Sequence, residues 1–201
     1  MTRKQSRVTG RHWLVVALML SWFLPYAVPM HAASLEPMPL KGDFSLVDET
    51  GRKVSLADYR GSMLLVYFGY TYCPDVCPTN LGIIAQALDM LPKAVTDNIQ
   101  PLLITVDPGR DLLVHLKEYT KAFHSSMMGL SGSEQAIAQA AKLFGVYYAK
   151  VETDPEEPDS YLMDHSASTY FLNEQGEIVD IFDHALPAEQ MVERILKWVN
   201  R

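Results

Sequence analysis

The chain has 201 residues, of which 48% are hydrophobic and 20% charged, and its formal net charge is −7. This length suits one domain after removal of a targeting segment. The charge is distributed unevenly, because four basic and no acidic residues precede Ser34, and the rest of the chain carries a net charge of −11. Such an acidic domain repels nucleic acid and anionic lipid surfaces, so we expect no nucleic-acid binding and a partner with a basic face.

Residues 1–33 have the pattern of a signal peptide or an N-terminal membrane anchor. An apolar run from Trp13 to Val28 follows the basic residues, and small residues at positions 32–34 offer a cleavage point. The run is slightly short for a membrane span, which needs about 17 to 25 residues. No cysteine lies near it, which excludes a lipid-modified cysteine. We expect an exported or membrane-tethered protein, with a linker over 34–42 and a folded domain over 43–201.

Apolar periodicity and turn residues predict an alternation of strands and helices in this domain. The predicted elements are, in chain order, a β-hairpin over 44–56, a buried strand over 63–68, a helix over 78–91, a strand over 101–106, helices over 111–123 and 133–145, an extended segment over 146–151, an acidic loop over 152–159, a hairpin with strands 168–172 and 177–182, and a helix from 187. The first two long strands should be parallel, because a helix connects them. The order predicts an α/β, thioredoxin-like fold with an added N-terminal β-hairpin.

Cys73 and Cys77 are the only cysteines, and they lie between the first buried strand and the helix that follows it. Pro78 is favoured at the first helical position, which predicts Cys77 at the helix N-terminus and Cys73 in the preceding loop. The positive potential there favours thiolates, although Asp75 opposes it. Residues four apart near a helix start have Cβ atoms about 5 to 6 Å apart, which suits a soft metal ion such as Cu(I) or, with adjustment, a disulfide. A disulfide closing so short a loop stabilises a fold little, so we expect a functional dithiol.

A site that also accepts Cu(II) needs a third, harder donor, and His165 is the best candidate. It stands shortly before the strand 168–172, where thioredoxin-like proteins usually face their dithiol with a cis-proline, and no proline is present here. Asp164 either orients the imidazole or caps the turn. A loop histidine held only by hydrogen bonds is the alternative reading. The other histidines are not expected to bind the metal: His12, His31, His115, His124 and His184.

Three motifs together resemble the Sco/SenC family of copper chaperones over about residues 40–199. They are Cys73-Pro-Asp-Val-Cys77-Pro-Thr, Val106-Asp-Pro-Gly-Arg-Asp111 and Asp164-His165-Ser166. The resemblance implies a domain that binds copper, as Cu(I) and/or Cu(II), through Cys73, Cys77 and His165. It further implies assistance in assembling the binuclear copper centre of cytochrome c oxidase, whose copper-centre subunit would be the partner.

The resemblance also bears on location, on other partners and on the second motif. With the N-terminal segment, it implies a periplasmic domain, exported or tethered to the inner membrane, that meets other copper chaperones or thiol reductases. In the second motif, Asp107, Arg110 and Asp111 are given only a structural role. Leu112 and Leu113 depart from the threonine and proline usual in the family.

Two redox functions compete with copper delivery. As a thiol–disulfide oxidoreductase, the protein would use Cys73 and Cys77 to reduce the cysteines of the copper acceptor, with Cys73 as the attacking sulfur. A peroxidase of the peroxiredoxin kind is disfavoured, because Val66 and Tyr70 occupy the positions where that class has proline and threonine.

Overall fold

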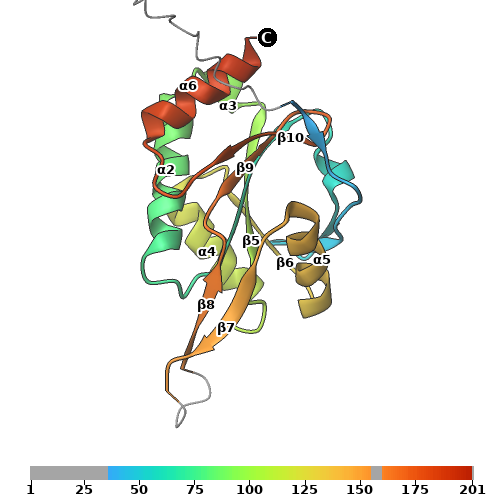
Figure 1. The fold of residues 1–201 in the computed structure, drawn as a ribbon, viewed down its shortest axis with the longest axis vertical. Coiled ribbons are helices and arrows are strands. Elements are labelled where there is room, and N and C mark those ends of the chain that lie inside the picture. The colour runs from blue at the N-terminus through green and yellow to red at the C-terminus, as the bar shows by residue number, and fades with distance from the viewer. Residues whose placement is uncertain (1–35, 155–159, 201) are drawn as a thin grey trace, which may run out of the picture. The chain divides into compact units, whose positions relative to one another are not determined.

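The computed structural model describes residues 36–154 and 160–200, and Figure 1 shows their arrangement. The predicted targeting segment, residues 1–33, and residues 155–159 of the predicted acidic loop lie outside the described residues. The elements are β1 (Met38–Pro39), β2 (Leu46–Asp48), β3 (Lys53–Val54), the 3-10 helix η1 (Leu56–Tyr59), β4 (Met63–Gly69), α2 (Val76–Met90), α3 (Lys93–Thr96), β5 (Ile99–Thr105), α4 (Leu113–Phe123), β6 (Met128–Ser131), α5 (Glu134–Phe144), β7 (Tyr148–Glu152), β8 (Tyr161–His165), β9 (Thr169–Leu172), β10 (Glu177–Phe182) and α6 (Ala188–Val199).

An eight-stranded sheet runs through the domain in the order β1-β10-β9-β4-β5-β6-β2-β3. β4, β5 and β6 are parallel, and helices connect them, whereas β9 pairs antiparallel with β4 and β10 with β9. The predicted parallel pair and the predicted C-terminal hairpin are therefore both present. This is a thioredoxin-like α/β arrangement.

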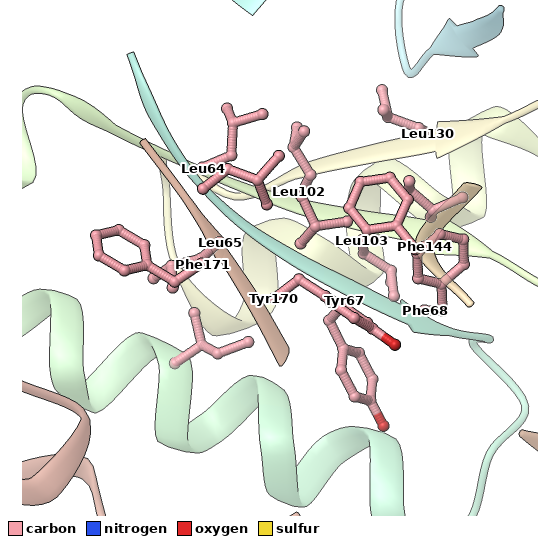
Figure 2. Close-up of a cluster of buried hydrophobic side chains, with 14 of the residues drawn as sticks. Leu64, Leu65, Tyr67, Phe68, Leu102, Leu103, Leu130, Phe144, Tyr170 and Phe171 are labelled. Carbon is pink, nitrogen blue, oxygen red and sulfur yellow. The ribbon is translucent and has the colours of Figure 1, made fainter. Parts of the chain in front are cut away.

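The central strand β4 is buried on both faces, which explains its continuous apolar sequence. Side chains alternate along a strand, so Phe68 points to one face of the sheet and Tyr67 to the other. Phe68 packs against Phe144 of α5, with ring centroids 5.4 Å apart, while Tyr67 contacts Asn80 of α2. Figure 2 shows the aromatic and aliphatic side chains that fill this core. The cysteines follow directly from the carboxyl end of this strand.

The helices cover the sheet from both sides. α2 packs beside α6 and contacts α4, while α5 covers the opposite face (Figure 1). α5 is the best-predicted helix, because the Ser133 side chain caps it by accepting a hydrogen bond from Ala136 N, and Gly145 ends it with a positive φ of 69°. Among the described residues, no helix combines the length and apolar character needed to cross a bilayer.

The N-terminal part of the domain adds strands at both edges of the sheet. β2 pairs antiparallel with β3 and also with β6. Met38 and Pro39 belong to the segment predicted as a linker, yet they form β1 and pair with β10. This part of the predicted linker is therefore a short edge strand of the domain.

Two further strands were not expected from the sequence. β6 was not predicted, and residues 161–165, between the predicted acidic loop and the predicted strand from 168, were assigned to no element. They form β8, which pairs with β7 from Tyr148↔His165 to Glu152↔Tyr161 as a separate two-stranded hairpin, and Figure 1 shows this hairpin projecting from the body of the domain. His165 stands at the end of the hairpin that adjoins the sheet.

Candidate metal centre

The dithiol lies where β4 passes into α2. The helix begins at Val76, two residues earlier than predicted, so Cys77 is its second residue and Pro78 its third. Proline is tolerated there because the first backbone N–H groups of a helix have no partner within the helix. Cys73 lies in the preceding loop, where its sulfur accepts a hydrogen bond from Cys77 N at 3.4 Å. Neither cysteine is part of a disulfide.

His165 faces the dithiol from the other side of the site. Its Nε2 atom is 3.3 Å from Cys77 Sγ, and its Nδ1 atom is 3.0 Å from the carbonyl oxygen of Ser166. A carbonyl oxygen can only accept, so Nδ1 carries a proton, and Nε2 is the ring nitrogen that faces the sulfurs. Asp164 is exposed and alternates with His165 along β8, so it points to the opposite face of this strand. The Ser166 carbonyl, and not Asp164, orients the imidazole.

The three donor atoms of Cys73, Cys77 and His165 all lie within 4.8 Å of one another. Both cysteines are buried and the histidine is half-buried. Two sulfurs and one imidazole nitrogen are donors that soft or borderline ions such as copper and zinc prefer. The arrangement could thus hold one such ion with three protein ligands.

Aromatic rings and a glycine shape the pocket around these donors. The rings of Tyr67 and Tyr70 stand edge-on to the imidazole, with centroids 6.1 and 5.9 Å from it. Gly69 ends β4, and a Cβ atom at this position would lie 2.9 Å from Cys77 Sγ. The absence of a side chain at Gly69 therefore provides the space that the sulfur occupies.

The two thiols differ in acidity because they are coupled. A hydrogen bond from the Cys77 thiol lowers the pKa of Cys73 to about 3, outweighing burial, and His165 acts in the same direction. The same coupling, together with burial, raises the pKa of Cys77. One proton is therefore retained on Cys77, while Cys73 is a thiolate. Cys73 is thus the cysteine that ionises, and the hydrogen bond from the Cys77 thiol is the main reason.

Asp111 fixes the loop that carries Cys73. Its carboxylate accepts hydrogen bonds from the backbone N–H and the hydroxyl of Thr71, the latter at 2.5 Å, and from the hydroxyl of Thr105 at 2.6 Å. Burial raises the pKa of Asp111, although these hydrogen bonds oppose the rise. The end of the second sequence motif is therefore tied to the beginning of the cysteine loop.

Asp107 and Arg110 connect the same motif to the hairpin that carries His165. Arg110 Nε donates to Asp107 Oδ2, Arg110 Nη1 donates to the carbonyl oxygen of Tyr161 at 3.0 Å, and the Tyr161 hydroxyl donates to Asp107 Oδ1 at 2.9 Å. The guanidinium lies over the Tyr161 ring, 3.5 Å from its centroid. The structural role predicted for this motif thus consists of holding both metal-facing segments.

The remaining described histidines lie elsewhere. His115 is exposed on α4, and His124 contacts Ser126 and Asp89. His184 is exposed, and its Nδ1 atom lies 3.3 Å from the side-chain oxygen of Asn80. His12 and His31 lie outside the described residues.

Fold and site together define a class: a thioredoxin-like domain with a Cys-Cys-His cluster suited to a soft metal ion. The SCO1/SenC family model matches residues 32–200. The chain belongs to the SCO1/SenC family.

Relatives and solved structures agree with this assignment. The chain is 40% identical over 156 residues to "Protein SCO2 homolog, mitochondrial" of Bos taurus, a match that covers 77% of this chain and 58% of that protein. It is 41% identical over 141 residues to "SCO2-like protein" of Rickettsia felis, covering 70% of this chain and 68% of that protein. Copper-bound ScoI of Arabidopsis thaliana superimposes with a TM-score of 0.74 at 33% identity, over 81% of this chain and 99% of that one. Yeast Sco1 with copper bound gives 0.71 at 34% identity, over 79% and 87%.

Sequence reasoning missed two residues that shape the site. Gly69 closes an apolar run, and only its position just before the cysteine loop hinted at a close approach. Asn80 is a buried polar residue on the inward face of α2, where its neighbours Leu81 and Ile84 are apolar. A buried asparagine in such a stripe is the signal that could have identified it.

Proposed function

We propose that this protein is a copper metallochaperone that carries the ion on Cys73, Cys77 and His165 and delivers it to the binuclear copper centre of cytochrome c oxidase. The observation that carries the proposal is the convergence of two sulfurs and one imidazole nitrogen within 4.8 Å, from residues up to 92 positions apart. Copper-bound structures of Sco relatives from Arabidopsis thaliana and yeast support copper as the ion.

The donor set suits transfer as well as binding. The Cys73 thiolate can enter the copper site without losing a proton, whereas Cys77 must release its proton when it becomes a ligand. With three protein donors, a copper ion keeps one side open to the ligands of an acceptor. Transfer then proceeds by exchange of ligands, one at a time, between donor and acceptor.

The cellular setting is part of the same proposal. The N-terminal segment, residues 1–33, exports the domain to the periplasm or tethers it to the inner membrane. The acceptor is the copper-centre subunit of cytochrome c oxidase, and the acidic charge of the domain favours a partner with a basic face. Other copper chaperones supply the ion.

A titration of the reduced protein with Cu(I) and Cu(II) tests the ligand assignment. Replacing Cys73 or Cys77 by serine should abolish tight binding of both ions. His165→Ala should abolish Cu(II) retention while two thiolates still hold Cu(I), and His115→Ala, a change at an exposed histidine on α4, should match wild type. Equal Cu(II) affinity in wild type and His165→Ala would remove histidine from the site.

The acidity of Cys73 also favours a second function, reduction of disulfides in the acceptor. Cys73 is 8% exposed while Cys77 is fully buried, so Cys73 is the sulfur that can attack. Disulfide-reduction assays on the His165→Ala protein separate the functions, because thiol exchange uses the two sulfurs, and the Cys77 thiol, more than the imidazole, makes Cys73 acidic. Loss of reductase activity in this variant would argue against an independent redox role.

A further inference from the structure

Asn80 makes hydrogen bonds with three separate segments of the domain. It lies on α2, three residues after Cys77, and is 4% exposed. Its Nδ2 atom donates to the carbonyl oxygen of Ala167 at 2.9 Å and to the Tyr67 hydroxyl at 3.3 Å. Its Oδ1 atom accepts from Ala185 N at 3.2 Å and lies 3.3 Å from His184 Nδ1. Both donors and both acceptor positions of the amide are therefore used.

The donor side of this amide faces the metal centre. Ala167 lies two residues after His165, in the segment that joins β8 to β9. The neighbouring carbonyl of Ser166 accepts from the imidazole Nδ1, so a shift of this segment changes the direction of Nε2. Tyr67, the second group held by Asn80 Nδ2, is one of the two rings that flank the imidazole. One side chain thus holds both the backbone and the ring that confine His165.

The acceptor side fixes Asn80 itself. Ala185 has a φ of 57°, the only positive φ of a non-glycine residue in the described parts of the chain. This conformation is costly for alanine, and the N–H that it presents is accepted by Asn80 Oδ1. The loop before α6 therefore orients the amide, which leaves Nδ2 directed at Ala167 and Tyr67.

We propose that Asn80 is a positioning residue of the metal centre, which fixes the imidazole of His165 relative to the two sulfurs without binding the ion itself. The inference deepens the proposed copper function and rests on it for the metal readout. It predicts that loss of the Nδ2 donor releases the 166–168 segment, so that His165 no longer keeps one tautomer and one direction. Asn80 makes no hydrogen bond with either sulfur; it reaches Cys77 only through the Tyr67 hydroxyl, so the sulfurs should move less than the imidazole.

The test uses the full-length reduced protein in two measurements. The first is nitrogen NMR of histidine-labelled protein without metal, with the His165 signal assigned by its loss in His165→Ala. Wild type should show the tautomer protonated at Nδ1. Asn80→Ala and Asn80→Asp should shift the signal toward a mixture of tautomers; the aspartate keeps the acceptor side but replaces the donor with a second acceptor oxygen, which is charged when ionised. The second measurement is Cu(II) affinity, which should fall about 10- to 100-fold in both variants while Cu(I) affinity stays near wild type.

Asn173→Ala is the matched control. Asn173 accepts hydrogen bonds from Gln175 N and Glu177 N in the turn between β9 and β10, at the end of β9 away from His165. The Asn173→Ala variant should have lower thermal stability, with the His165 signal and the Cu(II) affinity unchanged. A wild-type His165 signal in folded Asn80→Asp would overturn the proposal even if the protein bound no copper. Weak copper binding by wild type itself would instead contradict the proposed function.

Discussion

The sulfur of Cys77 lies so close to the end of β4 that a Cβ atom at Gly69 would be 2.9 Å from it. The same Cβ would also lie 2.8 Å from the Tyr67 ring. Gly69 has no positive φ, so its requirement is space and not backbone conformation. The dithiol geometry therefore depends on a residue with no donor atom of its own.

We predict that Gly69→Ala displaces Cys77 and weakens the metal site. Both contacts are buried in a packed core, so the substitution should also destabilise the fold by about 1 to 3 kcal/mol. Gly82→Ala is the matched control, because a Cβ there meets nothing within 4 Å and alanine favours a helix. Copper titration and urea unfolding of both variants test this. A Gly69→Ala protein with wild-type copper affinity would contradict the spatial argument.

Loss of Arg110 should destabilise the domain. The side chain of Asp107 is only 5% exposed, and Arg110 is its ion-pair partner. Removing one member of a buried pair leaves an uncompensated charge, so Arg110→Ala should cost about 3 kcal/mol in the free energy of unfolding. The exposed pair of Lys93 and Asp97 gives the control, since Lys93→Ala should change stability by less than about 1 kcal/mol. Similar midpoints in urea for the two variants would show that the pair is not stabilising.

The stability of the hairpin that carries His165 should depend on the Tyr161 hydroxyl. Tyr161→Phe removes the hydroxyl that donates to Asp107 and keeps the ring beneath Arg110. The loss should be near 1 kcal/mol, with increased hydrogen exchange of the β7 and β8 amides. Exchange in β4 and β5 should not change. Uniformly faster exchange throughout the sheet would instead indicate global destabilisation.

The two thiols should react with alkylating agents at different pH values. The pKa of Cys73 is lowered to about 3 by the Cys77 thiol, so in the metal-free protein its rate of alkylation by iodoacetamide should be nearly constant from pH 5 to 8. Cys77, whose pKa is raised, should remain unmodified over this range. Mass spectrometry of peptides from a timed reaction measures both. A common rate that rises about tenfold per pH unit would show that the thiols are not coupled.

The turn between β2 and β3 predicts a pH dependence of stability. Burial alone raises the pKa of Asp48, but hydrogen bonds from Thr50 and Arg52 outweigh it and lower the pKa to about 2. Because the pKa of Asp48 is lower in the folded than in the unfolded protein, its ionised carboxylate stabilises the fold by about 2 kcal/mol at pH values above the unfolded pKa. This stabilisation is lost as the pH falls from about 4 to 2. Asp48→Asn should remove that part of the acid dependence, and Thr50→Ala should give an intermediate curve. Urea unfolding at several pH values measures the free energy of unfolding of wild type and both variants. The same dependence of this free energy on pH in all three proteins would contradict the role of Asp48.

What the sequence alone determined is local. Ser133 and Gly145 define the ends of α5, and the apolar run after Met63 defines β4, because caps and burial patterns depend on neighbouring residues. The strand–loop–helix context also placed Cys73 and Cys77 side by side. The pairing of these cysteines with His165 came from family resemblance and fold analogy, not from any local pattern.

Only the tertiary structure decided how His165 reaches the sulfurs. Residues 161–165 have no strand pattern of their own, and they form β8 because β7 pairs with them and Arg110 binds Tyr161. The hydrogen bonds of the buried residue Asn80 join residues up to 105 positions apart. A buried polar group without a partner is costly, so burial selects hydrogen-bond partners wherever they lie in the chain. A contact between such distant residues leaves no periodic pattern in the sequence.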